Sequence, residues 1–158
     1  MPKNVPKYQS FREAWRRIDS AMAGGFFFEV VTICESIISD RLLSFVRGVT
    51  QANDIGTNTN FSRLIRLWRE NVKIQSQESS LDGLIDRVDC WRKERNKMVH
   101  GFVKSLPGTA TMPVDEFLAD ARKAADEGIK LARAVSAWQR SQLSEYRRRS
   151  ASSLSEKR

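Results

Sequence analysis

Histidine and cysteine are scarce in this chain of 158 residues, which has one histidine, His100, and two cysteines, Cys34 and Cys90. A structural zinc site built from histidine and cysteine takes four ligands, so a single chain cannot supply one. The two cysteines are far apart in the sequence and lie among apolar neighbours. This pattern is typical of small buried side chains in a reducing compartment. We therefore expect a cytoplasmic protein with no disulfide, metal or other cofactor.

Long hydrophobic runs are missing as well. The most apolar stretch, residues 21–34, is too short to cross about 30 Å of hydrocarbon, and it contains Glu29. Residues 1–8 include lysines and prolines but no apolar run, unlike a secretory signal. The sequence predicts no membrane-spanning segment.

Acidic residues are fewer than basic ones. The chain has 27 lysines and arginines against 19 aspartates and glutamates, a formal net charge of +8. Such an excess favours a polyanionic partner, because cations that neutralise phosphates release bound counterions. The charge alone does not separate RNA from DNA.

Apolar residues recur at helical spacing along most of the chain, and no segment has the alternation typical of a strand. With 41% hydrophobic residues, the chain is long enough for one folded core. We expect an all-α protein, an antiparallel bundle of about five helices. Residues 1–146 form the single domain in this prediction, and residues 147–158 form a basic disordered tail. The expected helices cover residues 10–24, 26–47, 60–72, 79–101 and 114–146.

Local residues mark several of the expected helix ends. Ser10 and Glu13 have the spacing of a capping box, as do Ser79 and Asp82. The glycines at positions 24, 25 and 101 are expected stops, and either residue 60 or residue 62 is the expected cap of the third helix. Residues 48–60 and 105–113 read as connections, the first of them mobile.

Most catalytic motifs are absent. The chain has no glycine-rich phosphate loop, no HExxH, no GxSxG and no Walker lysine. The segment 89–101, which contains the only histidine, is the one that stands out. The apolar stripe of its helix continues through Arg92 and Arg95, and a guanidinium aimed at a core needs a partner or a cavity.

Two further polar groups face the expected core from the helix over residues 26–47. Glu35 lies at the margin of its apolar stripe and Arg41 lies within it. Polar groups directed inward from two helices predict a shared polar cavity or an ion-pair network. On the later helix, Asn96 and His100 are four residues apart and share a face, whereas Arg95 and His100 are about 140° apart.

The run from Arg95 to His100 is R-x-x-x-x-H with a polar residue, Asn96, directly after the arginine. In a small helical chain, this motif resembles the HEPN superfamily of metal-independent ribonucleases and nucleotide-binding domains. The sequence-level likeness covers residues 94–101 and the likeness in organisation about residues 8–146. The resemblance implies an endoribonuclease of toxin or antiviral-defence type, in which the motifs of two subunits meet across a homodimer interface.

Under this resemblance, each motif residue has a role in metal-free cleavage, where the ribose 2′-OH attacks its own phosphate. His100 moves protons near neutral pH, Arg95 binds the phosphoryl oxygens, and Asn96 orients the histidine or the substrate. Glu35 is expected to fix the arginine or assist proton transfer, although a structural ion pair between Glu35 and Arg41 is the stronger expectation. The remaining expected site residues are Arg41 and Arg92 in support and Lys93, Lys97 and Lys104 as RNA contacts.

One position departs from a common form of the family. In toxins that have a nucleotidyltransferase antitoxin, the motif often continues to a tyrosine that becomes modified, and this chain has Phe102 there. If an antitoxin or other regulatory protein restrains this chain, adenylylation at that position is not its means.

Two other functions remain open on the sequence. The same bundle could be a non-catalytic module that binds a nucleotide or a partner protein, with the arginines serving only to bind phosphate or to pair with Glu35. Arg95 and His100 could also be a structural pair at the end of a helix. The bundle could also be a regulator that binds RNA or DNA, in which case the basic residues 147–158 would contribute to affinity.

Overall fold

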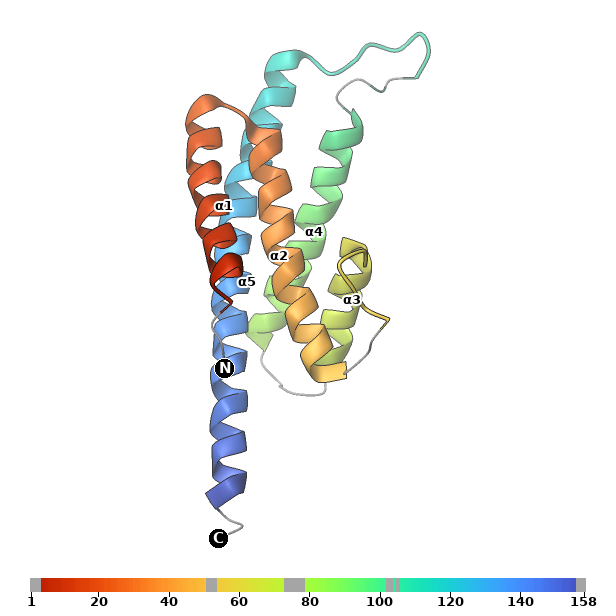
Figure 1. Cartoon of the computed structure of the whole chain (residues 1–158). Coiled ribbons are helices and arrows are strands. Elements are labelled where there is room, and N and C mark those ends of the chain that lie inside the picture. The colour runs from red at the N-terminus through yellow and green to blue at the C-terminus, as the bar shows by residue number, and fades with distance from the viewer. Residues whose placement is uncertain (1–3, 51–53, 73–78, 102–103, 105, 156–158) are drawn as a thin grey trace.

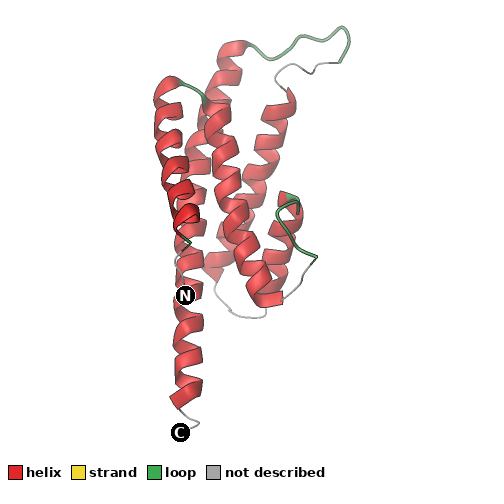
Figure 2. Cartoon of the chain, viewed as in Figure 1, coloured by secondary structure: helices red, strands yellow, loops and turns green. Residues whose placement is uncertain are grey.

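The computed structural model describes residues 4–50, 54–72, 79–101, 104 and 106–155. Five α-helices and their connections make up this part of the chain, which contains no strand (Figures 1 and 2). The expectation of an all-α bundle is confirmed. The helices are α1 Val5–Gly24, α2 Phe27–Thr50, α3 Phe61–Val72, α4 Ser79–Gly101 and α5 Val114–Ser155.

Helix α2 lies at the centre of the bundle. It packs most extensively against α5 and also against α1 and α3, while α4 packs against α5 and α3. The chain reverses direction between α1 and α2 and again between α4 and α5, whereas α2 and α5 run the same way (Figure 1). In the described part of the chain, no helix is long and apolar enough to span a membrane.

The core forms where α2, α3 and α5 meet. Ile38 and Leu42 of α2 and Trp68 of α3 are fully buried. The Trp138 ring of α5 lies 5.0 Å from that of Trp68 and 4.8 Å from that of Phe45, centroid to centroid. Such aromatic pairs add about 0.5–1.5 kcal/mol to the stabilisation from buried area.

Helix α1 begins earlier than the capping box predicts. Asn4 is the N-cap, and its side chain accepts a hydrogen bond from the backbone N–H of Lys7. Ser10 instead donates to the carbonyl of Pro6 inside the helix, and Glu13 binds Arg16. The prediction of a start at Ser10 is wrong because an asparagine followed by a proline in the first turn is a sufficient start signal by itself.

The other helix ends agree more closely with the sequence. Gly25 ends α1 in the left-handed region, at φ 75°, and Gly101 is the last residue of α4. Asn60 caps α3 through a 2.8 Å bond from the Arg63 N–H to its side-chain oxygen. In the connection before α3, Ile55 is buried against the core, so residues 54–60 are anchored to it.

Helix α5 extends beyond its predicted end. It continues to Ser155 and protrudes past the other helices (Figure 1). The prediction of a disordered tail is therefore wrong for residues 147–155, and residues 156–158 lie outside the described part. Arginine and alanine have high helix propensity, and residues 147–155 contain no glycine or proline to end the helix.

One glycine marks the closest approach of three helices. A Cβ atom on Gly128 of α5 would lie 2.7 Å from Cζ2 of Trp91 on α4 and 3.3 Å from Cβ of Cys34 on α2. The indole N–H of Trp91 donates to the carbonyl of Ala124, at 2.7 Å. Gly128 thus allows the indole to lie directly on the backbone of α5.

Candidate ribonuclease site

Arg95 lies on the side of α4 that faces α2, where it forms an ion pair with Glu35. About a fifth of the Arg95 side chain and a quarter of the Glu35 side chain remain exposed. Burial lowers the pKa of Arg95, so this guanidinium needs a nearby anion. The structure confirms the predicted polar contact between two helices and assigns Glu35 to Arg95.

The Arg95 guanidinium keeps donors beyond those used by Glu35. A guanidinium carries five N–H groups, and one carboxylate accepts at most two of them in a fork. The Nε atom of Arg95 is buried and has no hydrogen-bond partner among the described residues. Glu35 thus holds Arg95 in place, and because Nε is buried, a second anion could reach only the terminal nitrogens of the guanidinium.

Asn96 and His100 lie on another part of the α4 surface. Asn96 is half-buried, and His100 is exposed in the last turn of the helix. Their spacing places them on one face, as expected, and the turn of the helix separates this face from that of Arg95. No described contact joins His100 to Arg95 within one chain.

Arg92 pairs within its own helix. Its Nε atom is 2.9 Å from Oδ1 of Asp89, and Nζ of Lys93 is 3.0 Å from the other oxygen of that carboxylate. Burial raises the pKa of Asp89, but the hydrogen bonds from Lys93 and Arg92 outweigh it and lower the pKa overall. Asp89 therefore neutralises Arg92, which the sequence left without a partner.

Arg41 does not belong to this site. It faces α1 and α5, with its guanidinium carbon 4.0 Å from the ring centroid of Phe11 and its Nε 3.5 Å from Oγ of Ser136. The expected ion pair between Glu35 and Arg41 is wrong, as is the assignment of Arg41 to support of the motif. The two residues lie six positions apart on α2, which turns them by about 120° to different neighbours.

The lysines expected to contact RNA lie at the surface. Lys97 pairs with Glu94, its Nζ 2.9 Å from Oε1, and this carboxylate raises the pKa of the lysine. Lys104 is exposed in the connection to α5. Lys93 and Lys97 are thus already partnered by carboxylates of α4, which leaves Lys104 as the least restrained of the three.

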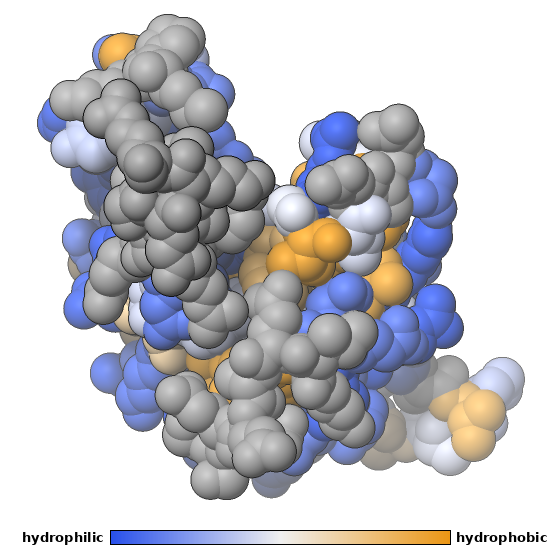
Figure 3. Space-filling view, turned by 90° about the horizontal axis from the view of Figure 1, so that it is seen from below, coloured by the Kyte–Doolittle hydropathy of each residue, from blue (hydrophilic) through white to orange (hydrophobic). Residues whose placement is uncertain are grey.

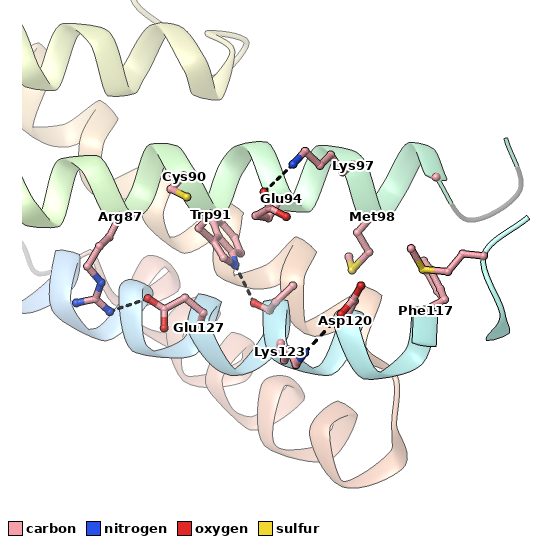
Figure 4. Close-up of a pocket in the computed structure, with 13 residues that line it drawn as sticks. Arg87, Cys90, Trp91, Glu94, Lys97, Met98, Phe117, Asp120, Lys123 and Glu127 are labelled. Carbon is pink, nitrogen blue, oxygen red and sulfur yellow. Dashed lines mark hydrogen bonds and ion pairs between the residues drawn. The ribbon is translucent and has the colours of Figure 1, made fainter. Parts of the chain in front are cut away.

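A cavity of about 490 Å³ lies beside the motif, between α4 and α5 (Figure 4). Trp91, Met98 and Phe117 form its apolar wall, and ion pairs such as Arg87–Glu127 lie along its edge. Neither the motif arginine nor the histidine lines it. The sequence marks its apolar residues only as core, and no motif reveals that they border a cavity.

Both cysteines were expected to be buried, and the structure bears this out for one of them. Cys34 is fully buried, whereas Cys90 is exposed on α4 at the edge of the cavity. Within the described part of the chain, no three His, Cys, Asp or Glu side chains are grouped as ligands for a metal ion. Phe102, at the position of the tyrosine discussed above, lies outside the described residues.

No protein-family model, curated protein or solved structure matches the chain.

Proposed function

We propose that the chain is a metal-independent endoribonuclease of HEPN type that acts as a homodimer. The observation that carries this proposal is the Arg95–Glu35 ion pair, which holds an arginine at the helix interface with about a fifth of its side chain exposed. Asn96 and His100 follow on the same helix with the spacing of the motif. The reaction is attack of a ribose 2′-OH on the adjacent phosphate, which gives a 2′,3′-cyclic phosphate and a 5′-OH.

Each motif residue has a defined part in this reaction. His100 takes the proton from the 2′-OH or gives one to the leaving 5′-oxygen, since an imidazole nitrogen can accept or donate a proton. The Arg95 guanidinium stabilises the charge that develops on the phosphoryl oxygens. Glu35 is a positioning residue, because it touches the arginine and not the reacting atoms.

A second copy of the chain supplies the missing proximity of Arg95 and His100. Helix α4 ends and α5 begins at the same end of the bundle (Figure 1), and several apolar side chains of these segments are exposed. Val99, next to His100, is 44% exposed, and Leu118 on α5 is also 44% exposed. A two-fold interface there would cover these side chains and bring the His100 of each subunit towards its partner.

The net charge of the chain favours a polyanionic substrate. In the view from the C-terminal end of α5, most of the described residues are hydrophilic (Figure 3). With a net charge of +8, the chain attracts RNA before any specific contact forms. Because the proposed reaction requires a ribose 2′-OH, we propose RNA as the substrate and infer that a toxin or antiviral-defence role follows from its cleavage.

The first test is incubation of the protein with RNA in excess EDTA. We expect cleavage by the wild type, loss of cleavage in His100→Ala and Arg95→Ala, and weak activity in Arg95→Lys, which keeps the charge but loses the fork. Arg66→Ala, an exposed arginine of α3, is the matched control and should cleave as the wild type does. Normal helicity and a normal oligomeric state in each variant separate catalysis from folding.

A mixing experiment tests whether two chains share each site. If Arg95 of one subunit acts with His100 of the other, an Arg95→Ala subunit and a His100→Ala subunit together restore one intact site per heterodimer. An equal mixture then regains about a quarter of the wild-type activity, since about half of the dimers are mixed and each has one working site. Persistent inactivity of verified heterodimers would show that each site belongs to one chain.

The rival function is a non-catalytic binding or assembly module. One observation favours it: Arg95 is already neutralised by Glu35, as in a structural ion pair. This function predicts no cleavage by the wild type, and Arg95→Ala would then lower stability and ligand affinity together. Cleavage in EDTA that requires His100 excludes it.

A further inference from the structure

A second polar cavity, of about 300 Å³, lies where α1, α2 and α5 meet. Three of its lining residues are arginines, and one is a carboxylate. It lies on the α1 and α5 side of α2, whereas the ribonuclease site lies on the side of α4. We call it the arginine pocket, and it is lined by Trp15, Asp19, Arg41, Arg133, Ser136 and Arg140.

Arg41 is fixed in this pocket by neutral groups and a distant carboxylate. Its guanidinium carbon lies over the ring of Phe11, and its Nε is 3.5 Å from the hydroxyl of Ser136. The nearest carboxylate oxygen, on Asp40, is 4.0 Å from Nη1, and Asp40 is bound more closely by Lys7, at 2.7 Å. Only about a quarter of the Arg41 side chain is exposed. Arg41 is thus a partly desolvated cation without a close counter-ion.

The two other arginines come from one face of α5. Arg133, Ser136 and Arg140 are spaced three and four residues apart, so they line the same side of the helix. The Arg133 guanidinium carbon lies 5.5 Å from the ring centroid of Trp15 on α1. Burial lowers the pKa of Arg41, Asp40 opposes this effect, and the positive charge of Arg140 lowers the pKa further. Arg140 is therefore close enough to Arg41 for the two charges to repel.

The charges around the pocket do not balance. Asp19 is the only acidic residue that lines it, and no ion pair joins Asp19 to these arginines among the described residues. Like charges held together around a cavity oppose folding unless an anion enters. Three arginines and a serine line the same cavity, and this set of donors suits an anion with several oxygens better than a single carboxylate.

We propose that the arginine pocket binds a phosphate group. The phosphate belongs either to a free nucleotide or to the backbone of an RNA strand, and both present the same oxygens to the guanidiniums. This site is separate from the Arg95–His100 motif, and the proposal does not depend on cleavage. On an RNA strand it would provide an anchor away from the reacting phosphate.

Calorimetric titration of the full chain in EDTA tests the proposal with three probes: inorganic phosphate, 5′-AMP and a short 2′-O-methyl RNA, which has no free 2′-OH to attack. We expect the wild type to bind at least one probe. The double variant Arg133→Gln/Arg140→Gln should weaken that binding by about tenfold or more, since two charge-assisted contacts are lost. These arginines are exposed, so the fold should persist, and circular dichroism checks this.

The matched control is Arg47→Gln/Arg122→Gln, which removes the same charge from exposed positions of α2 and α5 outside the pocket. This control should change the affinity by less than threefold, which corresponds to about 0.6 kcal/mol in binding free energy. Binding of phosphate or 5′-AMP identifies a nucleotide site, and binding of the oligonucleotide alone identifies a strand anchor. The proposal is overturned if no probe binds or if the control loses as much affinity as the pocket variant.

Discussion

Gly128→Ala tests the packing of α5 against α4 and α2. The new methyl group would lie 2.7 Å from Cζ2 and 3.2 Å from Cε2 of Trp91. The indole is 3% exposed, and the bond from its N–H to the Ala124 carbonyl holds it in place. The ring therefore has little freedom to move away, and either the ring or the helix must shift.

The expected magnitude follows from opposing effects. Overpacking costs about 1–3 kcal/mol, and a weakened hydrogen bond of Trp91 adds about 1 kcal/mol. Alanine regains about 1 kcal/mol of helix propensity over glycine. The free energy of unfolding should therefore fall by about 1–3 kcal/mol, which lowers Tm by about 2–12 °C for a chain of this size.

Thermal and urea unfolding of both variants provides the measurement. The matched control is Gly83→Ala in α4, where an added Cβ has no neighbour within 4 Å. Gly83→Ala should stabilise the protein by up to about 1 kcal/mol, because only the propensity term applies. A Gly128→Ala protein as stable as the wild type, or more so, would refute the account of this contact.

Three more predictions concern other parts of the chain. Burial raises the pKa of Cys34 from 9.0 to about 12. A thiol reagent at mildly alkaline pH should therefore modify the exposed Cys90 quickly and Cys34 only after unfolding. Rapid modification of two thiols per chain would contradict this. The pKa of Glu13 is lowered from 4.5 to about 2, mainly by its hydrogen bond with Arg16. The pair therefore stabilises the fold above pH 4.5, and this stabilisation is lost as Glu13 is protonated towards pH 2. Between pH 4.5 and pH 2, the urea midpoint should fall less in Glu13→Gln than in the wild type, and 1 M salt should reduce this difference between the two proteins. Equal pH profiles of the two proteins would contradict the pairing. Asn60→Ala should lower the free energy of unfolding by about 1 kcal/mol, since the N-cap of α3 is lost, and an unchanged urea midpoint would count against that role.

Helical spacing was enough to predict the class of the fold and most helix ends. Gly25, in the left-handed region, and the cap at Asn60 act through local backbone geometry, so they can be read directly from the sequence. The start of α1 and the length of α5 were less predictable. At the start of α1, the signals of Asn4 and Ser10 compete. At the end of α5, high helix propensity competes with the charge of the basic residues.

The candidate site was only partly visible in the sequence. Periodicity directed Arg95 towards the core and Glu35 towards the margin of another helix, and these two residues meet. Periodicity could not show which neighbour each face of α2 meets, so Arg41 was assigned to the same site although it faces α1 and α5. The arginine pocket forms only where three helices pack together, and the sequence of each helix does not show which other helices are its neighbours.

The most direct test of the ribonuclease proposal is cleavage of one RNA strand in EDTA by the wild type and by His100→Ala, beside a 2′-O-methyl copy of the strand. The account predicts that only the wild type cuts, that it cuts only the unmodified strand, and that the product carries a 2′,3′-cyclic phosphate. Equal cleavage by His100→Ala, cleavage of the 2′-O-methyl strand, or intact RNA with a verified wild-type dimer would contradict it.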